Sequence, residues 1–151
     1  MQSDELDDLY REVILDHYRK PRNRQLVENA EIQSEGNNPF CGDDVALQLK
    51  LNGSGTIQDI GFQGRGCSIS QASVSMLTEA IKGKTLEEAE ALNKTFRRLM
   101  RGEELDDADM EALGDLSALQ GVCKFPVRIK CALLAWTTLE EGVEKHLERE
   151  G

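Results

Sequence analysis

The stretch Val45-Ala46-Leu47-Gln48-Leu49-Lys50-Leu51 decides the fold, because it alternates apolar and less apolar residues without interruption. This period of two is typical of a β-strand that turns one face toward a core and the other toward solvent. The turn Asn52-Gly53-Ser54-Gly55 follows, and we expect residues 56–62 to return as the second strand of a hairpin. Residues 30–34 are a candidate for a short third strand at the edge of the sheet.

Helical periodicity governs most of the remaining sequence. It covers the residues before Pro21, residues 68–82, and the segment from Thr85-Leu86-Glu87-Glu88, which fits a capping box, to about Met100. A long final helix is expected from Pro126, because proline suits the first turn of a helix. Strands followed by helices predict an α+β fold, with a small antiparallel sheet of about three strands and helices packed on one face.

One acidic segment lacks a clear period. Residues 103–115 contain seven acidic residues and no basic residue, so their charges repel one another unless solvent or other elements separate them. We interpret this segment as solvated and partly irregular.

Length and composition limit the class of protein. A chain of 151 residues with 39% hydrophobic and 30% charged residues can fold as a single domain, residues 1–151, without disulfides. A net charge of −10 argues against binding to nucleic acid, which requires clustered positive charge. No apolar run approaches the roughly 20 residues of a membrane span, and the acidic stretch Met1–Asp8 does not resemble a signal peptide. We therefore expect a cytoplasmic protein whose four cysteines are thiols or metal ligands rather than disulfides.

Three cysteines occupy positions that are unusual for a purely structural thiol. Cys41 lies in a turn-rich loop before a strand, Cys67 stands at a predicted helix start after Gly64-Arg65-Gly66, and Cys131 lies early in the last helix. A lone cysteine is usually a small buried hydrophobe, but the glycine and polar neighbours of Cys41 and Cys67 do not fit that interpretation. A helix N-terminus favours the thiolate, which is the form that binds metal or attacks sulfur.

Asp43 completes a set of four candidate ligands, since it follows Cys41 after a single glycine. Three thiolates and one carboxylate suit zinc or an iron–sulfur centre, although the spacing is not that of a zinc finger. A plain turn residue is the alternative for Asp43. His17 falls on the apolar stripe of the first helix, where packing or a hydrogen bond at its edge is expected, and neither His17 nor His146 neighbours a cysteine.

Four segments together resemble the U-type iron–sulfur cluster assembly family, which comprises SufU, IscU and the N-terminal domain of NifU. They are Leu15-Asp16-His17-Tyr18-Arg19-Lys20-Pro21-Arg22-Asn23, Asn38-Pro39-Phe40-Cys41-Gly42-Asp43, Gly64-Arg65-Gly66-Cys67-Ser68-Ile69-Ser70 and Phe125-Pro126-Val127-Arg128-Ile129-Lys130-Cys131. The resemblance covers nearly the whole chain, with the motifs in the same order. The long segment 84–120, and Lys130 where the IscU branch carries a histidine, resemble the SufU branch.

The resemblance implies a role, a ligand set and partners. Family members receive persulfide sulfur from a pyridoxal-phosphate cysteine desulfurase, of the SufS type for this branch, and serve downstream Suf cluster-assembly proteins. Cys41, Asp43, Cys67 and Cys131 match the family's metal ligands, with Zn²⁺ as the expected cofactor and a transient [2Fe–2S] cluster as the alternative. No nucleic acid or membrane partner is implied.

We accordingly expect a zinc-dependent sulfur acceptor for iron–sulfur cluster biogenesis, a sulfurtransferase-like carrier rather than a stand-alone enzyme. A [2Fe–2S] assembly scaffold is one alternative, and a structural zinc-binding interaction domain is another. Cys41 is the expected acceptor, because it matches the family pattern and lies in a loop where backbone rotation is easy. Arg128 and Lys130 are auxiliary candidates that could offset the charge of the site or serve as a docking surface, and ordinary surface charges on a helix are the alternative. Cys123 matches no shared position and is a bystander, an auxiliary thiol or a redox partner.

Overall fold

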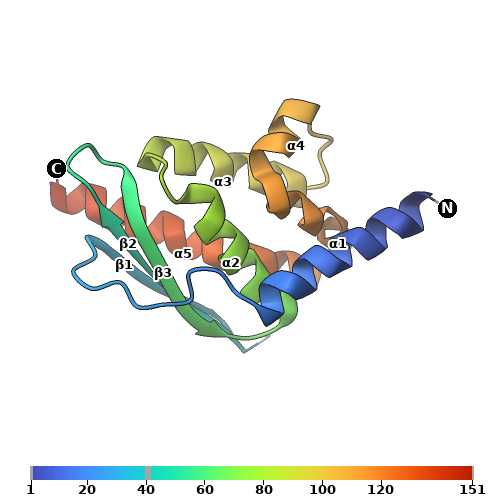
Figure 1. Ribbon diagram of the computed structural model, residues 1–151, viewed down its shortest axis with the longest axis horizontal. Coiled ribbons are helices and arrows are strands. Elements are labelled where there is room, and N and C mark those ends of the chain that lie inside the picture. Colours follow the sequence, from blue (N-terminus) through green and yellow to red (C-terminus); the bar gives the residue numbers. More distant parts are fainter. Residues whose placement is uncertain (1, 40–41, 151) are drawn as a thin grey trace.

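The computed structural model describes residues 2–39 and 42–150, except for the side chains of residues 2–9 (Figure 1). The helices α1 and α5 lie along the long dimension of the molecule, and the two ends of the chain lie at opposite ends of the view. The elements in chain order are α1 (Gln2–Arg19), β1 (Ile32–Asn38), β2 (Asp43–Leu51), β3 (Ile57–Arg65), α2 (Ser68–Ile81), α3 (Leu86–Met100), α4 (Asp107–Leu113), the 3₁₀ helix η1 (Gly114–Lys124) and α5 (Pro126–Glu150).

The sheet confirms the predicted hairpin. Its three antiparallel strands have the order β1-β2-β3, and Leu47 in the middle strand lies opposite Phe62 of β3. The edge strand β1 begins two residues later than expected and extends four residues further, so that Asn38 pairs with Asp43. The strand pairing therefore continues up to the loop that carries Cys41.

One face of the sheet carries the core. Val45, Leu47 and Leu49 are almost fully buried, as the alternation of β2 predicts. The helix α5 packs on β1 and β2, and α2 packs on β3, so the α+β fold with helices on one face is confirmed. No helix of the described chain is long and apolar enough to cross a bilayer.

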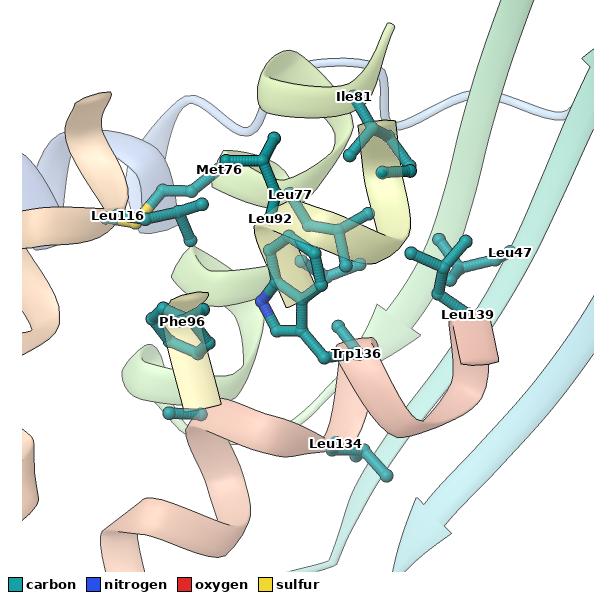
Figure 2. Packing of buried hydrophobic residues seen from close by; sticks show 14 of the residues in the cluster. Leu47, Met76, Leu77, Ile81, Leu92, Phe96, Leu116, Leu134, Trp136 and Leu139 are labelled. Atoms are coloured by element: carbon teal, nitrogen blue, oxygen red, sulfur yellow. The ribbon is translucent and has the colours of Figure 1, made fainter. Parts of the chain in front are cut away.

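Trp136 of α5 connects this helix to α2 and α3. Its ring lies fully buried between Leu77 of α2 and Phe96 of α3, and it stacks on Phe96 with centroids 5.5 Å apart (Figure 2). The Nε1 atom of Trp136 has no hydrogen-bond partner among the described residues. The indole therefore contributes through apolar contact and stacking, which anchor α3 to the rest of the core.

The capping box predicted at the start of α3 is present. The Thr85 hydroxyl accepts a hydrogen bond from the Glu88 backbone N–H at 3.1 Å, and the Glu88 carboxylate accepts one from the Thr85 N–H at 3.0 Å. The backbone hydrogen bond from Thr85 holds the pKa of Glu88 below its usual value. Gly83, with φ of 85°, directly follows Lys82, the C-cap of the preceding helix.

The acidic segment is largely exposed and is irregular over residues 103–106, as expected, whereas residues 107–115 form α4 and the start of η1. Asp106 caps α4 by accepting a hydrogen bond from the Asp109 N–H at 2.8 Å, so an acidic residue serves a structural purpose here. Arg98 of α3 pairs with Glu103 and Asp109, both at 3.3 Å, which separates the repelling charges. Leu113 is buried in the core and thereby attaches the segment to the rest of the fold.

Candidate metal centre

Three of the four predicted ligands converge at one end of the sheet. The ligand atoms of Asp43, Cys67 and Cys131 all lie within 4.8 Å of one another. Asp43 is the first residue of β2, Cys67 is the N-cap of α2, and Cys131 lies in the second turn of α5. Cys41 lies outside the described residues, and only Gly42 separates it from Asp43 in the chain.

Asp43 is held in a fixed orientation. Its side chain is fully buried, and Oδ1 accepts a hydrogen bond from the Cys67 backbone N–H at 2.8 Å. The second oxygen, Oδ2, lies 3.9 Å from the Cys67 Sγ. One carboxylate oxygen therefore positions the residue while the other faces the thiols, which a solvated turn residue would not do.

Gly66 makes this arrangement sterically possible. A Cβ on Gly66 would lie 2.2 Å from the Asp43 Oδ1 and 2.8 Å from the Ser70 Oγ, and the φ of 151° disfavours any side chain. Gly64 is constrained in the same way, since its Cβ would lie 2.4 Å from the Asp44 carbonyl oxygen. The close approach of β3 to β2 thus explains Gly64, and the nearby Asp43 and Ser70 side chains explain Gly66.

The two described cysteines differ in their surroundings. Cys67 is half-buried, and its sulfur accepts a hydrogen bond from the Ser70 N–H at 3.5 Å, in the place where a serine or aspartate usually caps a helix. Cys131 is fully buried, and its Sγ lies 3.7 Å from the Val127 carbonyl oxygen. Cys67, Cys123 and Cys131 form no disulfide with one another.

The structure places the two auxiliary candidates in separate hollows. Lys130 is exposed and lines a hollow with Asn38 and Pro39, on the side of the loop that leads to Cys41. Arg128 is also exposed but lines a groove between α1 and η1. Cys123 is half-buried in η1 and is not a member of the group formed by Asp43, Cys67 and Cys131.

A second group of ligand-type side chains, His17, Glu79 and Asp115, has a structural explanation. The His17 ring is buried, with Nδ1 at 2.8 Å from the Ser75 Oγ and Nε2 at 2.8 Å from the Asp115 Oδ2. Glu79 faces the Arg22 guanidinium, whose Nε lies 3.7 Å from Oε1. His17 thus fastens α1 to α2 and to η1, as expected for a histidine at the edge of an apolar stripe. No local pattern indicates its partner Asp115, which lies 98 residues away in the chain.

The sheet, its helical cover and the Cys/Asp group define the class of protein. The family model of the NifU-like N-terminal domain matches residues 9–151, and the chain belongs to this family. The resemblance to U-type cluster assembly proteins is thereby confirmed.

Individual members of the family show which proteins this chain is similar to. The chain is 54% identical to the zinc-dependent sulfurtransferase SufU of Bacillus subtilis (strain 168) over 140 residues, which cover 93% of this chain and 92% of SufU. It is 41% identical to the iron–sulfur cluster assembly scaffold protein IscU of Streptococcus pyogenes serotype M1 over 145 residues, covering 96% and 89%. The crystal structure of FiSufU, assigned as a cluster assembly scaffold of the SUF system of Fervidobacterium islandicum AW-1, superposes with a TM-score of 0.80 at 38% identity, covering 87% of this chain and 93% of that one.

Proposed function

We propose that this chain is a zinc-dependent sulfur acceptor of iron–sulfur cluster biogenesis. It takes persulfide sulfur from a pyridoxal-phosphate cysteine desulfurase and relays it to downstream cluster-assembly proteins. The observation that carries the proposal is the group Asp43, Cys67 and Cys131, with Cys41 two residues before Asp43. The similarity to a zinc-dependent sulfurtransferase supports the same assignment.

The chemistry of the donor set fits zinc. Asp43 is a fully buried carboxylate beside the thiols of Cys67 and Cys131. Because a buried charge is strongly unfavourable unless it is compensated, a bound cation would stabilise this group of ligands. Cys41, Asp43, Cys67 and Cys131 would hold Zn²⁺, which when bound keeps the thiols deprotonated and protected from oxidation.

We assign Cys41 as the acceptor because the other two candidate thiols, Cys67 and Cys131, are constrained by their surroundings. Cys131 is fully buried, and the backbone of Cys67 is tied to Asp43 while its sulfur caps α2. The thiolate of Cys41 attacks the outer sulfur of the donor persulfide, forming a new S–S bond to Cys41. The electron pair of the old S–S bond leaves with the donor cysteine as a thiolate, and the proton stays on the transferred sulfur. The exchange is redox-neutral and needs no further reactant.

A [2Fe–2S] scaffold is the second candidate function, since three thiolates are also ligands for iron–sulfur clusters and one relative is an IscU scaffold. Metal analysis and the visible absorption spectrum of anaerobically purified protein separate the two. We expect about one zinc ion per chain and no charge-transfer bands in the visible range. Stoichiometric iron with such bands would favour the scaffold.

Sulfur transfer itself is tested by incubating the purified chain with a cysteine desulfurase and cysteine. We expect protein-bound persulfide on the native chain and on Cys123→Ser, a matched control outside the ligand group. Cys41→Ser should lose it. A native chain that carries zinc but never acquires persulfide would show a structural zinc domain instead.

A further inference from the structure

The second group of ligand-type side chains, His17, Glu79 and Asp115, lies away from the candidate metal centre. Its ligand atoms all lie within 4.8 Å of one another. Glu79 lies in α2, twelve residues after Cys67, which is about 18 Å along the helix axis at about 1.5 Å per residue. The group therefore shares no residue with the candidate metal centre, and it joins α1, α2 and η1.

Two carboxylates of this group face one nitrogen of His17. Nε2 lies 2.8 Å from the Asp115 Oδ2 and 3.9 Å from the Glu79 Oε1. A ring nitrogen carries at most one proton, so a hydrogen bond from Nε2 explains the contact with Asp115 and leaves the position of Glu79 unexplained. A cation held between the three side chains accounts for both contacts.

The charges around this group favour a cation. Arg22 is shared between two acids: its Nη2 pairs with Asp16, while its Nε lies 3.7 Å from the Glu79 Oε1, which is too far for a hydrogen bond. One guanidinium thus faces two carboxylates, and Asp115 adds a third negative charge beside His17. A dication would offset the excess of negative charge.

His17 is fixed in the way that metal-binding histidines usually are. Its ring is buried, and Nδ1 lies 2.8 Å from the Ser75 Oγ, which also accepts a hydrogen bond from the Arg22 backbone N–H at 2.8 Å. A hydroxyl oxygen has two lone pairs, so Ser75 can accept a second hydrogen bond from Nδ1–H and leave Nε2 available to a metal. Ligating histidines are normally oriented through their second nitrogen in this manner.

The two carboxylates give an ion access from solvent. The side chains of Glu79 and Asp115 are 49% and 57% exposed, whereas that of His17 is 1% exposed. At metal–ligand distances of about 2.0–2.2 Å, ligand atoms around one ion lie roughly 3–3.5 Å apart. The pair at 2.8 Å must therefore open slightly and the pair at 3.9 Å must close, and half-exposed side chains can make both shifts by rotation.

We propose that His17, Glu79 and Asp115 form a second metal site for a divalent first-row transition-metal ion. One imidazole nitrogen and two carboxylates hold the ion, and water fills the remaining positions. Because soft thiolates are the better zinc ligands, this site exchanges its ion on dialysis while the thiolate centre keeps zinc. The bound ion ties η1 to α1 and α2 more firmly than the hydrogen bonds of His17 do alone.

Manganese tests this site in the zinc-loaded chain, because Mn²⁺ prefers carboxylate and water ligands to thiolates. The electron paramagnetic resonance signal of free Mn²⁺ measures binding during a titration. We expect one saturable site per chain, with the affinity weakened roughly tenfold or more in Glu79→Gln and in Asp115→Asn. Each variant keeps the size of the side chain and removes its charge. Glu104→Gln is the matched control, since Glu104 is an exposed acid of the irregular segment 103–106, and it should bind Mn²⁺ like the native chain.

Thermal unfolding gives an independent measurement. A ligand that binds only the folded chain raises its melting temperature. Saturating Mn²⁺ should therefore raise the melting temperature of the native chain and of Glu104→Gln, and it should leave that of Glu79→Gln unchanged. Neither measurement involves the thiols, so a failure of sulfur transfer would leave the second metal site standing.

Three results would overturn the proposal. The first is a native chain that binds no Mn²⁺. The second is an equal loss of affinity in Glu104→Gln and Glu79→Gln, which would show ions gathering diffusely along the acidic segment. The third comes from nitrogen NMR in excess Zn²⁺, which is diamagnetic: a His17 ring protonated on both nitrogens would show that an imidazolium, and not a metal ion, compensates the two carboxylates.

Discussion

Gly66→Ala should damage the candidate metal centre although it replaces none of the proposed ligands. The new methyl carbon would lie 2.2 Å from the Asp43 Oδ1 and 2.9 Å from its Cγ, so the carboxylate must move. Displacement breaks the 2.8 Å hydrogen bond from the Cys67 N–H, and a hydrogen bond to a charged group contributes about 1.5–3 kcal/mol. The backbone conformation at φ of 151° adds about 1–3 kcal/mol for a residue with a side chain.

Together these effects predict a loss of about 2.5–6 kcal/mol in the free energy of unfolding, together with loss of bound zinc. Gly83→Ala is the control, because its φ is 85° and its Cβ would meet no atom within 4 Å. It should cost only the backbone part, about 1–2 kcal/mol, and keep the metal. Urea unfolding of chelator-treated protein separates the collision from the contribution of zinc. Equal stabilities and full zinc content in both variants would refute this account of Gly66.

Three further changes test the fold around the centre. Glu88→Gln should flatten the pH dependence of the melting temperature: the folded pKa is lowered, so the stabilisation is complete above the unfolded value of about 4.5 and is lost as the pH falls through the folded value. If the melting temperatures of the native chain and of Glu88→Gln fell equally between pH 6 and 3, this explanation would be contradicted. Loss of metal at low pH affects both proteins alike and does not change the comparison. Asp115→Ala should cost about 1–3 kcal/mol in urea unfolding, because the buried His17 Nε2 loses its partner, whereas the exposed Glu104→Ala should be nearly neutral. Trp136→Phe should cost less than Trp136→Ala, for which about 3–5 kcal/mol is expected, because the ring contact with Phe96 survives and no hydrogen bond is lost. Equal losses in both would show that the indole acts through something other than this packing.

Some elements could be predicted from the sequence because the residues that specify them are close together in the chain. The alternation from Val45 to Leu51 fixes which side chains of β2 face the core, and the turn after it sets the pairing of Leu47 with Phe62. The capping box at Thr85 and Glu88 is equally local, since all its partners lie within one turn. These predictions needed no knowledge of distant residues.

The missed features depend on contacts between distant segments. The acidic stretch folds because Arg98 of α3 pairs with Asp109 and because Leu113 reaches the core, neither of which its own composition indicates. The candidate ligands were recognisable as residue types, but the role of Gly66 appears only when its missing Cβ is seen beside Asp43. Arg128 was a candidate only because it lies near Cys131 in the sequence, and the structure adds that it lines the groove beside α1.

Acceptance of the persulfide sulfur by Cys41 is the most directly testable part of the proposed function. Peptide mapping by mass spectrometry, under non-reducing conditions after incubation with a cysteine desulfurase and cysteine, measures this site by site. We predict the mass increment of one sulfur atom on the peptide that contains Cys41, with Cys67 and Cys131 unmodified. A stable increment on Cys67 or Cys131, with Cys41 unmodified, would contradict the assignment of Cys41 as the acceptor.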